Sequence, residues 1–439
     1  MVSLNRVLSG GTAVLTHEGA PAKRITPLQE LQRSTMACLL WEDSFYESGV
    51  SIAERIAKLV HSLSGPEVAK VATDARTKFK LRHVPLLLAR ELARHPQKSE
   101  RTYVADLLAT IIQRPDELTE FLAIYRKDKR EPLSAQVKKG LAKAFPKFNA
   151  YNLAKYNRDG AYKLRDVLFL THAKPKDTEQ AEVWKQLVDK TLASPDTWEV
   201  ELSAGKDKKE TFERLIRENK LGALALLRNL RNMEQAGCDE KLVSGALESM
   251  SVERVLPFRF ITAARYAPKM EPVLEQAMFK GIEGVERLPG KTVLLVDVSG
   301  SMTAMISGRT EISRIDAACG LAILLREIAE KCVVYTFSAG PKLVPARRGF
   351  ALRDAIMGQF GGFTNTETAK RQADAEGYDR LIILTDEQSH QALSNPRTDK
   401  GYVVNVAAYK NGVGYGKWNH VDGWSESVIE YIKALETLE

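Results

Sequence analysis

The hydrophobic period of this chain changes once, near Pro289 and Gly290, and that change limits the folds it can adopt. Before it, apolar residues recur at helical spacing, for example at positions 133, 137, 141 and 144. After it, Thr292–Val296 is a near-continuous apolar run, typical of a strand buried on both faces of a parallel sheet. The sequence therefore predicts two architectures in one chain, with Pro289 and Gly290 as the hinge between them.

Residues 28–285 predict short helices in succession. Apolar stripes at helical spacing alternate with prolines that lie near the expected helix ends, and strand-like runs are nearly absent. This pattern is typical of an α-solenoid of helix pairs, and roughly 40–47 residues per HEAT-like unit would allow about six units. A globular helical bundle is the alternative.

Residues 291–439 alternate between strand and helix patterns. Buried strands are expected at residues 292–296, 332–337, 379–386 and 402–409, and helices at residues 312–331 and 425–436. This alternation predicts a doubly wound α/β domain with a mainly parallel sheet.

Composition restricts the class of protein. Hydrophobic residues make up 44% and charged residues 27% of the chain, as in ordinary globular proteins, and no apolar run reaches the roughly 18 residues of a membrane span. The N-terminus lacks the apolar core of a secretory signal. The cysteines at positions 38, 238, 319 and 332 form no C-x-x-C pair, which argues against a zinc knuckle. We expect a soluble, cytoplasmic protein with free thiols and no membrane partner.

The positive charge is concentrated in the helical part. Residues 291–439 hold 17 Lys and Arg against 18 Asp and Glu, so the chain's net charge of +8 places +9 on residues 1–290. Such an asymmetry indicates an anionic partner for the helical part, and nucleic acid is the commonest candidate.

Oxygen-bearing side chains follow the expected strands of the α/β part. Asp297, Ser299 and Ser301 come directly after the first strand, Thr364 and Thr366 lie in a later glycine-rich loop, and Asp386 ends another strand. Ligands bind at the carboxyl edge of such sheets. Mg²⁺ prefers oxygen ligands and takes only one or two carboxylates, so we expect a divalent metal site, with Mg²⁺ as the ion.

The most basic stretch of the helical part begins with the cations of residues 125–130 and continues into a lysine-rich helix. It carries Lys138, Lys139 and Lys143, and further cations follow with aromatic residues interleaved up to Tyr162. Cations neutralise phosphates, and aromatic faces stack on unpaired bases. A solvated basic face with its rings turned into the core explains the composition equally well.

The oxygen-rich loops resemble the metal-ion-dependent adhesion site of von Willebrand factor A domains, whose pattern is D-x-S-x-S, then T, then D. The resemblance covers about residues 291–439. It implies Asp297, Ser299 and Ser301 as first-loop ligands, Thr364 as the second-loop ligand with Thr366 as the competing choice, and Asp386 as the third-loop acid. It also implies an open coordination shell that an acidic group of a partner can complete.

Nearly the whole chain resembles the Ro ribonucleoprotein autoantigen family, in which a TROVE module precedes a von Willebrand A domain. The matching stretches are THEGAPA, Lys155-Tyr156 followed by Arg158 and Gly160, LRDVLFLTHAKP, ALLRNLRNM and LPFRFITAARY. The spacing from Lys155 to Gly160 departs slightly from the eukaryotic pattern. The resemblance implies a ring of HEAT-like repeats over residues 1–288, closed by an A domain over residues 289–439.

The same resemblance implies a function. Small noncoding Y-like RNAs would bind the outer basic surface through Lys155, Arg158 and His172, and single-stranded 3′ ends of misfolded RNAs would enter the central hole. The protein would be a monomeric, non-catalytic prokaryotic scaffold. It would act in RNA quality control, maturation or degradation with an exoribonuclease such as polynucleotide phosphorylase.

Two other functions compete with this one. The first is a metal-dependent, protein-binding adhesion module with the helical part as a spacer, which the +9 charge disfavours. The second is a metal-dependent nuclease with His390, four residues after Asp386, as its base. Two-metal nucleases cluster more carboxylates than this loop set offers.

Overall fold

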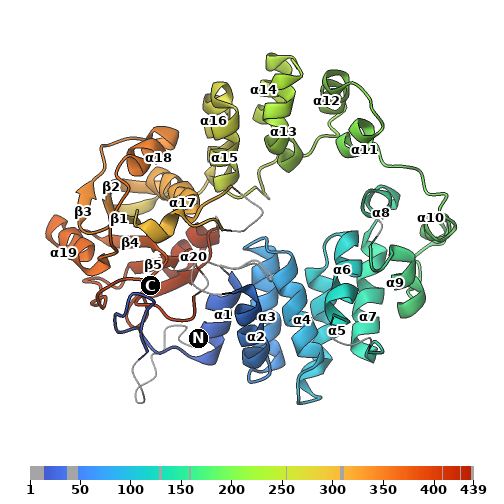
Figure 1. The fold of residues 1–439 in the computed structure, drawn as a ribbon, viewed down its shortest axis with the longest axis horizontal. Helices are drawn as coiled ribbons and strands as arrows, with labels where there is room; N and C mark the ends of the chain where they lie inside the picture. The colour runs from blue at the N-terminus through green and yellow to red at the C-terminus, as the bar shows by residue number, and fades with distance from the viewer. Residues whose placement is uncertain are drawn as a thin grey trace. The chain divides into compact units, whose positions relative to one another are not determined.

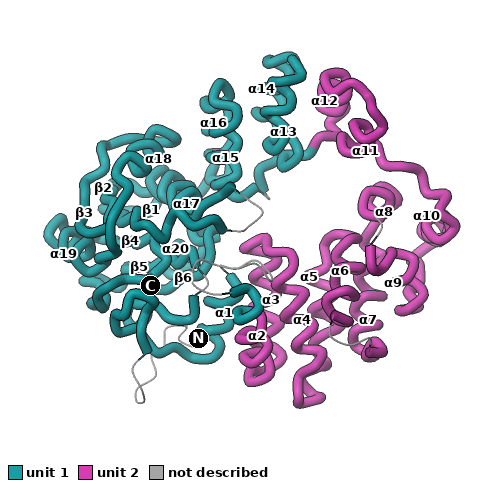
Figure 2. Tube along the Cα trace, in the orientation of Figure 1, with its two compact units in different colours: residues 1–52, 222–439 teal, residues 53–221 magenta. Residues whose placement is uncertain are grey.

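The computed structural model describes residues 14–36, 48–127, 131–157, 160–253, 255–306, 311–407, 409–425 and 427–436. The chain divides into two compact units (Figure 2). Unit 1 comprises residues 1–52 and 222–439, and unit 2 comprises residues 53–221. Within the described ranges, every helix is too short or too polar to cross a membrane.

Unit 2 is helical. After α2 (Gly49–Val60), which begins just before the unit, its helices are α3 (Gly65–Thr77), α4 (His83–Ala93), α5 (Val104–Ile111), α6 (Pro115–Tyr125), α7 (Ala135–Ala144), α8 (Ala150–Tyr156), α9 (Leu164–Thr171), α10 (Thr178–Asp189), α11 (Trp198–Ser203) and α12 (Lys208–Arg217). Short 3₁₀ turns occupy Glu100–Tyr103 and Phe145–Lys147.

The helices of unit 2 stack in two alternating layers. In one layer α3 contacts α5, α5 contacts α7 and α7 contacts α9, and in the other α4 contacts α6 and α6 contacts α8. Figure 1 shows α3 to α7 side by side. In α7, the hydroxyl of the N-cap Ser134 accepts a hydrogen bond from the amide of Val137, and Val137, Leu141 and Ala144 are fully buried. The predicted helix-pair solenoid is confirmed.

Unit 1 combines helices with a sheet. Its helices are α1 (Pro27–Met36), α13 (Ala223–Gln235), α14 (Glu240–Ser249), α15 (Phe258–Tyr266), α16 (Glu271–Phe279), α17 (Arg314–Ile328), α18 (Gly349–Met357), α19 (Thr366–Glu376) and α20 (Ser427–Glu436), with 3₁₀ turns at Pro268–Met270, Lys280–Ile282 and Gly300–Thr303. Its strands are β1 (Leu288–Asp297), β2 (Ala329–Phe337), β3 (Pro341–Leu343), β4 (Arg380–Thr385), β5 (Gly401–Asn405) and β6 (Asn419–Asp422).

The sheet has the strand order β3-β2-β1-β4-β5-β6. All neighbours pair in parallel except β2 and β3, which pair antiparallel. The order reverses between β1 and β4, since β2 lies on one side of β1 and β4 on the other. In a doubly wound sheet this reversal opens a crevice at the carboxyl ends of the two strands, where ligands bind.

Helices cover both faces of this sheet. One face forms a buried cluster with α19, made of Val293, Leu295, Leu381, Ile383 and Val403 of the strands with Ala369 and Ala373 of the helix. The other face meets α17, which is buried nearly all round because it also contacts α15 and α18. Cys319 lies in α17 as a fully buried free thiol, as expected of a small core residue.

The predicted α/β domain is confirmed, and two short strands, β3 and β6, escaped the sequence analysis. The predicted hinge is wrong. Pro289 and Gly290 lie inside β1, where the pairing register shifts, and the Gly290 amide donates to the Glu330 carboxylate at 2.8 Å. Unit 1 extends across the predicted domain boundary between residues 288 and 289. The division into a domain of residues 1–288 and a domain of residues 289–439 stays a prediction.

Candidate metal centre and RNA-binding face

Two buried aspartates lie at the reversal point of the sheet. Asp297 is the last residue of β1, and Asp386 follows Thr385, the last residue of β4. Because β1 and β4 are parallel neighbours, both carboxylates lie at the same edge, and neither side chain is exposed to solvent. The two acids predicted from separate motifs are therefore brought to one edge by the sheet.

The first loop is held in shape by its own polar groups. The Asp297 carboxylate accepts hydrogen bonds from the Ser299 amide at 2.9 Å and from the Thr385 hydroxyl at 2.6 Å. The hydroxyl oxygens of Ser299 and Ser301 lie 3.3 Å apart. Two hydroxyls and a carboxylate of the predicted ligand set thus share one turn.

The second loop packs against the first. The Gly361 amide donates to the carbonyl of Val298 at 3.1 Å, and the Gly300 amide donates to the carbonyl of Gly362. Thr364 follows and is 4% exposed, whereas Thr366 begins α19 and its buried hydroxyl has no hydrogen-bond partner among the described residues. Both threonines are therefore inside, and the choice between them stays a prediction. Asp297, Ser299, Ser301, Thr364 and Asp386 are called the metal edge below.

The electrostatics of the metal edge suit a cation. Burial first, and then the charge of Asp386, raise the pKa of Asp297 to about 7. A divalent ion between the two carboxylates would relieve this repulsion, and hydroxyls are ligands of the kind that Mg²⁺ accepts. In the described part of the chain, no cluster of three or more His, Cys, Asp or Glu is arranged for a metal, and the metal edge itself combines two carboxylates with hydroxyls. The donor set fits a hard divalent cation.

An arginine that the sequence analysis did not single out also reaches the metal edge. Arg314, the first residue of α17, is 3% exposed, and its guanidinium lies 3.2 Å from the Asp386 carboxylate. This fixed positive charge neutralises part of the negative charge that a metal would bind. The sequence gives no signal for it, because Arg314 is 72 residues away from Asp386 along the chain.

The other ionisable groups near the third loop have structural partners. His390 lies 3.0 Å from the Glu18 carboxylate and 3.1 Å from the carbonyl of Thr364, and its ring meets that of Phe363 edge-on. Glu387 is fully buried in an ion pair with Arg33. Asp379, at the opposite end of β4, accepts a hydrogen bond from the Lys291 amide. Both ring nitrogens of His390 therefore have partners within the protein.

Unit 2 presents the predicted basic residues at its surface. Lys138, Lys139 and Lys143 are exposed on α7, and the Lys143 ammonium lies 2.6 Å from the Asp106 carboxylate. His172 is exposed and closes α9 in the left-handed conformation, with φ 52°. Arg158 lies outside the described residues. Lys138, Lys139, Lys143, Lys155 and His172 are called the basic face below.

Lys155 lies on α8 among tyrosines. Its ammonium is 5.8 Å from the ring centres of both Tyr151 and Tyr156, and Tyr151 is 42% exposed. Lys155 also lines a cavity of about 600 Å³ between α8 and residues 192–203. By contrast, Phe145 and Phe148 are buried. Each of the two interpretations therefore holds for part of the aromatic residues. The phenylalanines belong to the core, and the tyrosines of α8 are partly exposed.

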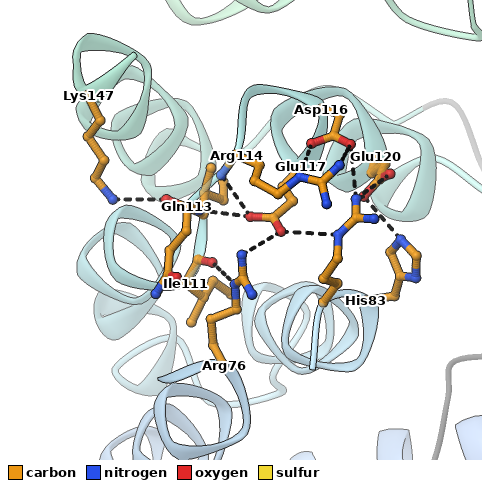
Figure 3. A network of polar contacts seen from close by, with 11 residues as sticks. Arg76, His83, Ile111, Gln113, Arg114, Asp116, Glu117, Glu120 and Lys147 are labelled. Atoms are coloured by element: carbon orange, nitrogen blue, oxygen red, sulfur yellow. Dashed lines mark hydrogen bonds and ion pairs between the residues drawn. The ribbon is translucent and has the colours of Figure 1, made fainter. Parts of the chain in front are cut away.

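A network of ion pairs braces the helices beside α8 (Figure 3). Glu117 is fully buried and accepts hydrogen bonds from Arg76 at 2.7 Å and from the amides of Gln113 and Arg114. Arg82 extends the network to Asp116, Glu117 and Glu120. Arg114 continues it to α8, since its guanidinium lies 4.5 Å from the ring centre of Tyr156. No pattern in the sequence predicts this network.

Comparisons with known proteins agree with this architecture. A family model described as the TROVE domain matches residues 189–280. Telomerase protein component 1 of Mus musculus is 36% identical over 89 residues, which is 19% of this chain, and the chain spans only 3% of that relative. The crystal structure of the Deinococcus radiodurans RO (RSR) protein superposes with a TM-score of 0.58 at 17% identity, covering 93% of this chain and 99% of that one. These findings confirm the resemblance to the Ro and TROVE proteins.

Proposed function

We propose that this chain, with its TROVE domain and the fold of a Ro protein, is a non-catalytic RNA-binding scaffold. Its ligands would be small Y-like RNAs on the basic face and single-stranded 3′ ends of misfolded RNAs at a second site. A partner exoribonuclease such as polynucleotide phosphorylase would process the RNA. The place of action would be the cytoplasm, and the scaffold would be a monomer.

The observation that carries this proposal is the surface around Lys155. On α8, the Lys155 ammonium, the partly exposed rings of Tyr151 and Tyr156 and a cavity occur together. Cations bind phosphates, and open aromatic faces stack on unpaired bases. The exposure of His172 and of the α7 lysines supports the same surface, because a side chain must reach solvent to contact RNA.

Mg²⁺ would be held by Asp297, Asp386, the hydroxyls of Ser299 and Ser301, and Thr364 or Thr366. The ion would supply an open coordination position for an oxygen of a partner. The chain's own residues fix the loops and bury both carboxylates.

A second function is favoured by one side chain beside the metal edge. Phe363, directly before Thr364, is 74% exposed. A large exposed apolar side chain next to a charged site suits a protein partner that presents an acidic group with apolar neighbours. A metal-dependent protein-binding module is therefore the alternative, and it is compatible with RNA binding at the basic face.

One experiment separates the functions. The full chain is mixed with a labelled structured small RNA and, separately, with a single-stranded RNA, over a salt series with and without Mg²⁺. We expect binding that weakens steeply with salt and leaves the RNA intact. Cleavage of the RNA that depends on Mg²⁺ would favour the nuclease, and absence of binding at low salt would leave only the protein-binding module.

A further inference from the structure

The loop that carries Asp386 is held from outside the sheet. Residues 387–390 follow Asp386 directly, and each contacts the N-terminal segment, residues 14–36. The contacts join Glu387 to Arg33, Gln388 to the amide of His17 at 2.8 Å, Ser389 to the hydroxyl of Thr16 at 2.9 Å, and His390 to the carboxylate of Glu18 at 3.0 Å. Four successive residues of a ligand loop thus depend on a segment more than 350 positions earlier in the chain.

Arg33 is the anchor of this segment. Its guanidinium is fully buried, pairs with Glu387 and donates to the carbonyls of Tyr409 at 2.5 Å and Asn411 at 3.0 Å. His420 completes the cluster with Asp422, because its ring lies 2.9 Å from Glu387 and 3.4 Å from Asp422. Two cations and two anions therefore neutralise each other inside the protein, as burial of charge requires.

The backbone packs closely around this cluster. Glu387 has a φ of 60°, which is unusual for a non-glycine residue and must be maintained by its surroundings. A Cβ at Gly412 would clash with both the Glu387 carboxylate and the Arg33 guanidinium. The pair therefore requires glycine at position 412, and Glu387 is the residue directly after Asp386.

We propose that residues 14–36 clamp the Asp386 loop and so determine the metal affinity of unit 1, with Arg33 as the positioning residue. The inference rests on the proposed metal site. Because coupling between two binding events is reciprocal, a metal at Asp386 also tightens the docking of the N-terminal segment.

The test compares two buried arginines: Arg33, which pairs with the residue after Asp386, and Arg380, which begins β4 at the end far from Asp386. Arg33→Met removes the clamp. Arg380→Met removes the fully buried Arg380, which pairs with Glu436 at the other end of β4. Both variants lose stability, but we expect only Arg33→Met to weaken Mg²⁺ binding, by about tenfold or more in isothermal titration calorimetry. Equal Mg²⁺ affinities in the wild type and Arg33→Met would overturn the proposal.

A milder variant and a second readout keep the test decisive. Thr16→Val removes the hydroxyl that donates to the Ser389 carbonyl and accepts from the Ala20 amide. This variant replaces Arg33→Met if that protein does not fold. In hydrogen exchange, Mg²⁺ should slow the amides of residues 14–36 in the wild type and leave them unchanged in Asp297→Ala. If the wild type binds no Mg²⁺, the metal proposal fails by itself, and faster exchange of residues 387–390 in metal-free Thr16→Val still decides whether the clamp exists.

Discussion

The metal edge of unit 1 and the basic face of unit 2 are built in opposite ways. At the metal edge, the two carboxylates are fully buried and reach each other because two parallel strands end side by side. On the basic face, the cations lie between residues 138 and 172 and point to solvent or line an open cavity. The first arrangement depends on contacts between distant segments, and the second on local helices and their exposure. Mutation, salt and pH should therefore affect the two differently.

The largest expected effect is the loss of the metal. Asp297→Ala removes one of the two carboxylates and leaves neutral hydroxyls, so the stabilisation by Mg²⁺ should disappear while the metal-free fold is retained. Calorimetric titration and thermal unfolding with and without Mg²⁺ measure this. RNA binding without Mg²⁺ should not change. Equal Mg²⁺ binding by the two proteins would show that the metal edge is assigned wrongly.

The next effect concerns the ion network of unit 2. Glu117→Gln leaves the buried Arg76 without its anion, whereas Arg82 keeps Asp116 and Glu120. The free energy of unfolding should fall by about 3–5 kcal/mol, because an uncompensated charge stays buried. Glu120→Gln is the control, because that side chain is 32% exposed and its loss should cost at most about 1 kcal/mol. Urea unfolding measures both. Similar losses in the two variants would contradict the special role of Glu117.

A pH dependence should distinguish unit 1. Burial alone would lower the pKa of His420, but Asp422 and Glu387 raise it to about 9. Protonated His420 therefore stabilises the fold fully below about pH 6.5, and this contribution of about 3 kcal/mol is lost as the pH rises through about 9. Unfolding of the wild type and of His420→Gln should converge at high pH. A constant difference between them from pH 6 to 10 would contradict this.

The affinity of unit 2 for RNA should depend on salt concentration. If Lys155 and Arg158 each neutralise one phosphate, the double alanine variant should lose about 1.4–1.8 from the slope of log affinity against log salt. Lys143→Ala should lose less than one contact, because Asp106 already pairs with that ammonium. His172→Ala should weaken binding with little change in slope near neutral pH. Unchanged affinity for structured RNA in all three variants would show that the basic face is only a solvated surface and does not bind RNA.

The smallest effect is a gain. Arg314→Gln removes the positive charge beside Asp386, so Mg²⁺ should bind several-fold more tightly in titration calorimetry. Arg371→Gln is the control, since Arg371 pairs with Glu367 at the surface of α19. Weaker Mg²⁺ binding in Arg314→Gln would show that the arginine supports the loop more than it competes with the metal.

Local patterns predicted much of the fold and part of the site. The apolar runs at residues 292–296 and 332–337 are β1 and β2, and the stripe through α7 is buried as its spacing requires. The short strands β3 and β6 were missed because three or four residues carry too little periodicity. The helix expected to extend to residue 331 ends at Ile328, since β2 begins at Ala329.

The sequence by itself determined where helical and strand patterns of apolar residues occur, where the strands end, and that Asp297 and Asp386 lie at strand ends. These properties depend on neighbours along the chain. Tertiary structure alone decided that Arg33 pairs with Glu387, that Arg314 reaches Asp386 and that Lys143 pairs with Asp106. The reason is physical: a buried charge is tolerated only beside its partner, and the choice of partner depends on which segments the packing brings together.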